Sequence, residues 1–323
     1  MSVLVETIPF ESLAGISVGN VQNDDAKTGV TVFYFPTPAT AAEKIFGGGP
    51  ASREISLLDV ERNDVPINAI VFSGGSSFGL EASTGVQMCL EEHGIGYDTG
   101  CAIVPLICQS DIYDLCYGKP DIRPDKSMGY DACLCAMRES RPKSGNVGVG
   151  IGATIGKAKG MRQACKCGIG YAAAQIGELK VGVAVVVNAF GDVYHHGQKV
   201  AGMVNEDRSA FADAADALYE NHPSNLFTGN TTLAAIFTNA NFNKSELTKV
   251  INMASAGLAR SIRPVFTMAD GDTIYCTSVG IDKVTADINV VGSLAADLVE
   301  DAIFDAVDSS RVSDTEFLSN YLL

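Results

Sequence analysis

Histidine is scarce in this sequence and tryptophan is absent. The 323 residues include no tryptophan and only four histidines: His93, His195, His196 and His222. A catalytic set that relies on a histidine base, or a metal site built from several histidines, therefore has few candidates. His195 and His196 are adjacent, so in a strand their rings would point to opposite faces, which argues against a zinc site formed by that pair.

Basic residues and long apolar runs are also in short supply. Lysine and arginine number 23 against 38 aspartates and glutamates, which gives a net charge of −15. Such an acidic chain would repel phosphate backbones, so we exclude a general nucleic-acid binder. The longest apolar stretch, Val181–Val187, suits a buried strand and is too short to span a membrane. The N-terminus lacks a basic start followed by an apolar stretch, so we expect a cytoplasmic protein with no membrane partner.

The cysteine pattern indicates neither a disulfide framework nor zinc. Nine cysteines are an odd number, so they cannot all pair within the chain. Most lie in apolar segments, where we expect reduced and buried side chains. Examples are Cys89, Cys101, Cys108 and Cys276. The Cys133-x-Cys135 and Cys165-x-Cys167 pairs are more closely spaced than usual zinc ligands and would share one face of a strand, so packing explains them better than a metal does.

The spacing of apolar residues predicts a mixture of strands and helices. Extended segments are predicted at Pro66–Phe72, Val181–Val187, Thr231–Thr238, Asp272–Gly280 and Asp287–Val291. Helices are predicted at Phe78–His93, Glu206–Glu220, Lys244–Arg260 and Ser293–Val307. In the first of these, Phe78 begins a single apolar stripe that we expect to be buried. Because these elements do not alternate strictly, we favour a layered α/β or α+β sandwich over a doubly wound parallel sheet.

Two glycine-rich tracts raise the question of nucleotide binding. Gly145–Gly160 matches neither the dinucleotide fingerprint nor the phosphate loop in order and spacing. Ser73–Gly79 lies between a predicted strand and a predicted helix, which Ser76 or Ser77 could cap, and its amides could bind an anion. A tight turn that lets the helix pack on the sheet explains the same residues more simply, and we favour that interpretation.

The junction of Asn230 and Thr231 is the most informative place in the chain. A segment rich in Pro, Asn, Ser and Gly, Asn221–Asn230, is predicted to be an exposed linker and leads directly into a buried strand. A precursor that cleaves itself would place its nucleophile here, with the Thr231 hydroxyl attacking the carbonyl of Asn230. The released α-amine, with an unperturbed pKa of about 7.7–8.0, could then act as a base without any histidine. Taken alone, two threonines at the start of a strand carry no such meaning.

Short motifs follow one another along nearly the whole chain. They are Thr28–Val32, Gly47–Glu54, Ser73–Leu80, Arg123-Pro124 with Met128–Tyr130, Gly145–Gly148, Gly152–Lys157, Val187–Asp192, Asn230–Leu233, Gly257–Pro264 and Asp270–Asp272. In this order the motifs resemble the L-aminopeptidase/D-esterase family of self-processing hydrolases. This family includes β-peptidyl aminopeptidases and 6-aminohexanoate-oligomer hydrolases.

The resemblance implies a role for particular residues. Thr231 matches the nucleophile released by cleavage after Asn230, and Asn188 matches an asparagine that donates to the oxyanion. Lys157 matches a lysine near the nucleophile. Asp270 and Asp272 match an acidic or hydroxyl-acid pair that orients the nucleophile and its amine. Without the resemblance, Lys157 would be interpreted as a loop lysine, Asn188 as a turn residue and the two aspartates as a hairpin turn. Tyr117 and Tyr130 are possible substrate-pocket residues.

The resemblance also implies a fold and an activity. We expect one domain over residues 1–323 with a four-layer αββα sandwich, processed into chains 1–230 and 231–323 that assemble further as homo-oligomers. The expected reaction hydrolyses short amides or peptides with a free amine through an acyl-enzyme, with no metal and no cofactor. Two alternatives remain open: acyl transfer of the ornithine acetyltransferase type, and an uncleaved protein that binds a small ligand. Substrate preference is the least transferable property, because Cys101–Tyr117 departs from the family pattern.

Overall fold

One long strand, β3 (Thr28–Ile45), connects the two halves of a ten-stranded sheet in the computed structural model, which describes residues 5–220 and 229–321. Its first part pairs with β2 (Ser17–Asn23) and β5 (Ile67–Ser73), and its last part pairs with β17 (Thr273–Ser278). Between the two parts lie Pro36 and Pro38, which have no N–H to donate, and the β3–β5 pairing is irregular there.

Each half of the sheet has its own strand order. The first half runs β1 (Glu6–Thr7), β11 (Ile169–Ile176), β12 (Leu179–Asn188), β15 (Thr231–Thr238), β17 and the end of β3. The second half runs from β3 through β5 and β8 (Ile107–Asp111) to β4 (Ser52–Arg53), with β2 on the other side of β3. Strands β15 and β17 are parallel, whereas β12 and β15 are antiparallel. The end of β12 therefore lies beside the starts of β15 and β17, and the polar residues there come together at one end of these strands.

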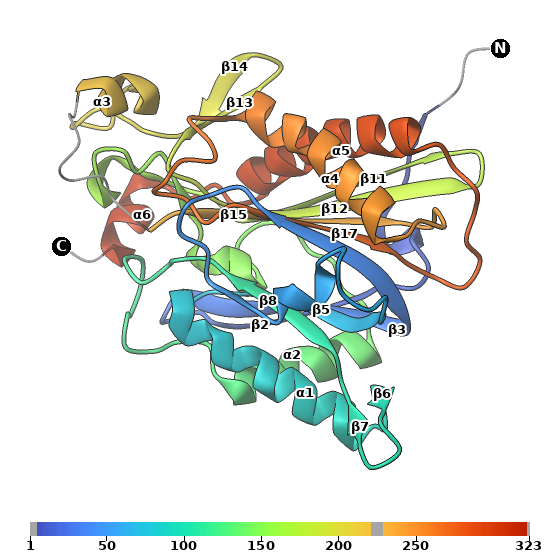
Figure 1. The fold of residues 1–323 in the computed structure, drawn as a ribbon. Helices are drawn as coiled ribbons and strands as arrows, with labels where there is room; N and C mark the ends of the chain where they lie inside the picture. The colour runs from blue at the N-terminus through green and yellow to red at the C-terminus, as the bar shows by residue number, and fades with distance from the viewer. Residues whose placement is uncertain (1–4, 221–228, 322–323) are drawn as a thin grey trace.

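The two halves of the sheet pack against each other, and helices cover the outer face of each half. The fold therefore has four layers, as expected from the sequence (Figure 1). Helices α4 (Lys244–Ser261) and α5 (Ile288–Ser309) cover the outer face of the first half, and α1 (Ala82–Glu92) and α2 (Lys126–Arg138) cover the second. Aromatic rings fill the space between the two halves. Phe33 packs against both Phe72 and Phe237 with ring centroids 5.3 Å apart, and all three side chains are fully buried.

Smaller elements complete the chain. The short strands are β6 (Tyr97–Asp98), β7 (Ile103–Val104), β9 (Thr154–Ile155), β10 (Cys165–Lys166), β13 (Asp192–His195), β14 (Gln198–Ala201) and β16 (Ile262–Arg263). The remaining α-helices are α3 (Ala214–Glu220) and α6 (Asp314–Asn320). The 3-10 helices are η1 (Phe10–Ser12), η2 (Ile55–Leu58), η3 (Ser76–Glu81), η4 (Gly148–Gly152) and η5 (Met161–Gln163).

Most predicted elements are confirmed within a few residues, and two are wrong. Asp287–Val291 is not extended, because Asp287 caps α5 by accepting a hydrogen bond from the backbone N–H of Asn289. Only the last half of Glu206–Glu220 is helical, as α3. The predicted linker Asn221–Asn230 lies mostly outside the described residues.

The start of the first predicted helix also differs from expectation. The chain enters it through η3, with Gly75 in the left-handed region, and neither Ser76 nor Ser77 caps α1 or η3 through its side chain. Phe78 was expected on the buried face but is 54% exposed, with the Arg123 guanidinium 3.7 Å from its ring centroid.

All nine cysteines are free thiols, but not all are buried. Cys101 is exposed because it lies in the turn between β6 and β7, a hairpin that projects from the body (Figure 1). Cys133 and Cys135 lie on a helix rather than a strand, so one is buried and the other exposed. Among residues 5–220 and 229–321, no helix is both long and apolar enough to cross a bilayer.

Candidate active site

Thr231 lies where three distant segments of the chain meet. It opens β15, pairs with Asn188 at the end of β12, and follows Asn230, which forms a parallel bridge with Asp270 just before β17. Lys157, from the loop after β9, reaches the same place. All five side chains are at least 97% buried. The structure therefore brings together every catalytic residue predicted from the sequence, including Asp272, which accepts a hydrogen bond from the backbone N–H of Thr232 next to Thr231.

The carbonyl of Asn230 is held on both sides. The Thr231 Oγ lies 2.5 Å from the Asn230 oxygen, and the backbone N–H of Gly271 donates to that oxygen at 2.8 Å. Attack by Oγ on the carbonyl carbon would place negative charge on this oxygen, where an N–H donor is already aimed. Gly271 has room for no side chain, because a Cβ there would lie 2.6 Å from the Gly49 oxygen and 2.8 Å from Thr231 Oγ.

Lys157 binds both the backbone just before the junction and the end of the neighbouring strand β12. Its Nζ donates to the carbonyl of Gly229 at 3.1 Å, to the carbonyl of Asn188 at 3.0 Å and to Asn188 Oδ1 at 2.8 Å. These acceptors match the three hydrogens of an ammonium group. Burial lowers the pKa of Lys157 to about 7, against the opposing effect of nearby groups led by Asp270. The charge at this position therefore changes near neutral pH.

Asn188 is locked in one orientation. Its Oδ1 accepts from the backbone N–H of Thr154 at 3.0 Å as well as from Lys157, and its Nδ2 donates to the carbonyl of Tyr113 at 2.9 Å. The Tyr113 carbonyl takes one of the two hydrogens on Nδ2. The position of the Nδ2 donor beside Thr231 is thus fixed. The alternative interpretation of Asn188 as a residue of a turn does not describe its surroundings.

Asp270 and Asp272 organise the loop that supplies Gly271. Asp270 accepts from the backbone N–H of Phe190 at 3.1 Å and also from the Thr267 hydroxyl. Asp272 accepts from the backbone N–H of Thr232 at 2.6 Å and from that of Phe266 at 3.0 Å. The segment is not a hairpin turn, because it leads into a strand parallel to β15.

The protonation of these two carboxyl groups is strongly affected by their surroundings. Burial raises the pKa of both, and the neighbouring Asp270 helps to raise the pKa of Asp272 to about 7. Lys157 acts in the opposite direction on Asp270. A buried cation and two buried carboxyl groups with pKa values displaced from their usual range are typical of functional sites.

The two predicted pocket tyrosines lie in different places. Tyr117 lines a small pocket with Lys157, and the other lining residues are Tyr113, Asp114, Cys116, Thr154 and Met161. Tyr130 lies on α2, where its hydroxyl donates to Glu92 of α1 at 2.6 Å. The structure places Tyr117 in the same pocket wall as Lys157, whereas Tyr130 lies between α1 and α2.

Several residues of this site carried no signal in the sequence. Gly271 was noticed only as part of a turn, and its N–H is recognisable only once the β15–β17 pairing is known. Asp114, with a pKa raised by burial to about 6, accepts from the Thr28 hydroxyl at 2.6 Å and from the Gly75 N–H at 2.7 Å. The neighbouring Gly74 and Ser76 amides also donate to backbone carbonyls, which supports the tight-turn interpretation of this tract over anion binding.

The histidine pair lies away from this junction, and the predicted orientation of its two rings is wrong. His195 ends β13, but His196 lies beyond the strand with φ +50° and is followed by Gly197 with φ +78°. This turn brings the two rings onto one side, with centroids 4.0 Å apart, instead of onto opposite faces. With Glu300 of α5 they form a group of potential metal ligands among the described residues.

Proteins of similar sequence include aminopeptidases and 6-aminohexanoate-oligomer endohydrolases. An uncharacterized aminopeptidase of Mycobacterium tuberculosis (strain H37Rv) is 34% identical over 302 residues, which cover 88% of this chain and 85% of that protein. A 6-aminohexanoate-oligomer endohydrolase of Kocuria sp. is 29% identical over 320 residues, covering 93% and 86%.

Solved structures share the fold at low sequence identity. The L-aminopeptidase D-Ala-esterase/amidase of Ochrobactrum anthropi, described as a variant of the Ntn hydrolase fold, superposes with a TM-score of 0.68 at 15% identity, covering 93% of this chain and 85% of that one. A β-aminopeptidase of Burkholderia sp. superposes with a TM-score of 0.62 at 19% identity, covering 95% and 91%. The model of peptidase family S58 matches residues 12–315, so the chain belongs to this family and is a hydrolase.

Proposed function

We propose that this hydrolase is made as a precursor that cleaves itself between Asn230 and Thr231, and that the new N-terminal threonine then hydrolyses small amides. Both chains, 1–230 and 231–323, would stay in one domain, because β12 of the first pairs with β15 of the second. The observation that carries the proposal is the Asn230 carbonyl, which lies between the Thr231 hydroxyl and the Gly271 N–H.

Self-cleavage would proceed in two steps. The Thr231 Oγ attacks the carbonyl carbon of Asn230, the C–N bond of the peptide breaks, and the hydroxyl proton passes to the departing nitrogen. The product is an ester between Asn230 and the Thr231 side chain, with a free amine on Thr231. Water then adds to the ester carbonyl and returns a hydrogen to Oγ, which leaves Asn230 as a carboxyl terminus and Thr231 as an amino terminus.

The same groups would serve the mature enzyme. The Thr231 amine acts as the base for its own hydroxyl, and the resulting acyl-enzyme is hydrolysed by water. Asn188 and Gly271 donate to the oxyanion, and Lys157 disfavours protonation of the amine and stabilises negative charge. Asp270 and Asp272 are positioning residues through their hydrogen bonds to the loops around Thr231.

The substrate class follows from the relatives and from the charge of the site. Two kinds of relative act on amides, aminopeptidases and 6-aminohexanoate-oligomer endohydrolases, and both names fit substrates that carry an amine. Buried carboxyl groups near the nucleophile are suited to such an amine. We therefore propose short peptides or ω- or β-amino acyl amides as substrates, with Tyr117 at the edge of the pocket and Tyr130 without a direct contact.

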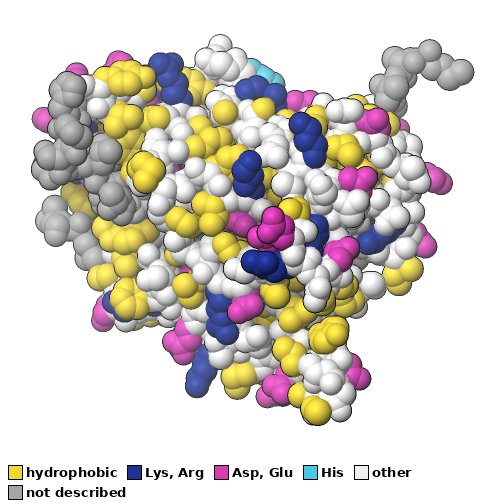
Figure 2. Space-filling view, in the orientation of Figure 1, with side chains coloured by type: hydrophobic (Ala, Val, Ile, Leu, Met, Phe, Trp, Pro, Cys, Tyr) yellow, Lys and Arg dark blue, Asp and Glu magenta, His cyan; other side chains and the backbone are white. Residues whose placement is uncertain are grey.

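Location and assembly belong to the same proposal. Nine free thiols suit the reducing cytoplasm, and we propose that the processed pairs assemble into homo-oligomers there. Acidic and basic side chains are interspersed over the face shown in Figure 2, with no basic stripe of the kind that binds nucleic acids.

Removing the Thr231 hydroxyl should stop processing. Thr231→Ala leaves no nucleophile, so intact-mass spectrometry of freshly purified protein should show one full-length chain. The parent protein should give two fragments, one ending at Asn230 and one beginning at Thr231. Thr231→Ser retains a hydroxyl and should still be cleaved at the same bond. Cleavage of Thr231→Ala at this bond would contradict the assignment of the nucleophile.

A methyl group at Gly271 should slow processing by moving the Gly271 N–H away from the Asn230 carbonyl. In Gly271→Ala the new Cβ would collide with Gly49 O and Thr231 Oγ, so the approach of Gly271 N–H to the Asn230 carbonyl is lost. We expect the rate of processing to fall by at least about 100-fold, which is the effect typical of removing one hydrogen-bond donor to an oxyanion. Gly49→Ala is the matched control in the facing loop, because its nearest neighbour, Asp270 O, lies 3.8 Å away. Equal processing in the two variants, measured by fragment mass over time, would refute this role.

The rate of self-cleavage should fall as the pH rises through about 7, the pKa of Lys157. Lys157 is an ammonium below this pH and neutral above it, so its stabilisation of developing negative charge is lost on the alkaline side. The precursor, made by cell-free synthesis, is shifted to different pH values and the fragments are quantified. Lys157→Met should be slower by about 10²–10³-fold and should show no decline across the same range. A parent rate that rises steadily through this range would contradict a cationic role.

A further inference from the structure

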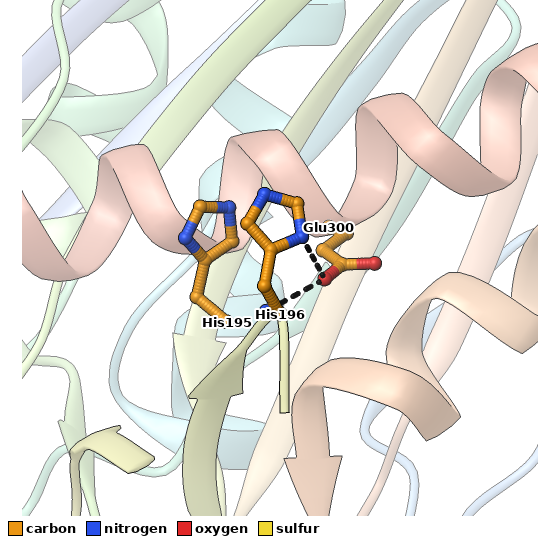
Figure 3. A group of neighbouring side chains, drawn as sticks. All are labelled: His195, His196 and Glu300. Atoms are coloured by element: carbon orange, nitrogen blue, oxygen red, sulfur yellow. Dashed lines mark hydrogen bonds and ion pairs between the residues drawn. The ribbon is translucent and has the colours of Figure 1, made fainter. Parts of the chain in front are cut away.

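His195, His196 and Glu300 lie together on the surface formed by the β13–β14 hairpin and α5 (Figure 3). Each offers a potential metal ligand, and the three ligand atoms lie within 4.8 Å of one another. The group lies outside the machinery around Thr231. Among the described residues it is the one cluster of at least three His, Cys, Asp or Glu side chains with such spacing.

Glu300 presents one oxygen to the histidines. Its Oε2 accepts from Arg260 Nε at 3.1 Å, which orients the carboxylate. Its Oε1 accepts from the backbone N–H of His196 at 3.2 Å and lies 3.7 Å from Nδ1 of the same residue (Figure 3). The side chain is only 13% exposed, so its position is restricted by the surrounding protein.

The two rings are placed by different constraints. His195 stacks on Phe304, one helical turn after Glu300, with centroids 4.1 Å apart and planes inclined by 11°. His196 occupies a left-handed position at the tip of a two-residue hairpin, which turns its ring to the side of His195. Its side chain is 78% exposed and therefore has room to rotate.

The surrounding charge suits a cation. Asp301 of α5 interacts electrostatically with both histidines, with Glu300 and with Asp297. Arg260 is bound to Asp297 and to Glu300. The surroundings thus hold three carboxylates besides one guanidinium and the two imidazoles. Imidazole nitrogen with a carboxylate oxygen is a donor set that suits zinc and neighbouring transition metals, whereas magnesium and calcium prefer oxygen alone.

We propose that His195, His196 and Glu300 bind a divalent transition-metal ion such as Zn²⁺, which ties the β13–β14 hairpin to α5. Tetrahedral zinc with bonds of about 2.1 Å requires donors about 3.4 Å apart. The ligand atoms lie within 4.8 Å of one another, so the donors must approach by at most about 1.4 Å, and the exposed His196 side chain has room to move. The site is independent of self-cleavage and should form in Thr231→Ala as well.

Equilibrium dialysis of tag-free protein against Zn²⁺, with metal analysis, tests this site. We expect one zinc per chain in the parent and in His93→Asn, a matched control on a histidine elsewhere. His196→Asn removes the imidazole but keeps the turn, because Asn followed by Gly is favoured at this hairpin position. This variant and Glu300→Gln should each bind at least about tenfold more weakly.

Cobalt substitution separates this site from the cysteines. Co²⁺ bound at His195, His196 and Glu300 should show no thiolate-to-metal charge-transfer band, whereas Co²⁺ at the exposed Cys101 or Cys135 would show one. The proposal is overturned if the parent retains no zinc, if both variants bind as tightly as the parent while keeping its circular dichroism spectrum, or if the cobalt spectrum shows thiolate ligation.

Discussion

The pairing of β15 with β12 on one side and with β17 on the other determines where the candidate catalytic groups lie. Antiparallel pairing sets Asn188 opposite Thr231, and parallel pairing brings the segment before β17 alongside Asn230. A shift of one residue in either register would turn these side chains to the opposite face of the sheet. The fully buried strand Thr231–Thr238, packed between two cores, resists such a shift.

This rigid frame also explains the unusual electrostatics. Lys157, Asp114, Asp270 and Asp272 are nearly excluded from water, and burial moves each pKa toward neutrality. Mutual attraction and hydrogen bonds to backbone groups offset part of the cost of burying these charges. The consequence for chemistry is a site in which protons can be exchanged near neutral pH without a histidine.

Much of the fold was predictable, because apolar spacing marks buried strands and one-sided helices. Thr231–Thr238 and α4 agree with the prediction to within one residue. Asp287–Val291 was predicted to be extended because its β-branched residues are typical of strands. The aspartate before them is instead the N-cap of α5, and the helix begins directly after it. The exposure of Phe78 was not predicted because the chain enters α1 through the 3-10 helix η3. Its tighter winding turns Phe78 away from the apolar face of α1.

The candidate site was predictable only in part. Thr231, Asn188, Lys157, Asp270 and Asp272 were found through family resemblance, and the structure places them together. Gly271 and Tyr113 contribute hydrogen bonds from backbone groups, which the sequence does not distinguish from those of any other residue. The orientation of the two histidine rings was predicted wrongly because a strand was assumed to continue through His196, although the following glycine is a hairpin signal.

Trapping of the acyl-enzyme tests the central claim, that Thr231 is the nucleophile of an amidohydrolase. The processed protein is mixed with a β-alanyl or 6-aminohexanoyl anilide, quenched in acid and mapped by peptide mass spectrometry. The account predicts an added acyl group on the peptide that begins with Thr231, and none when the amine of the substrate is acetylated. Turnover with the acyl group on another residue, such as a cysteine, would contradict it.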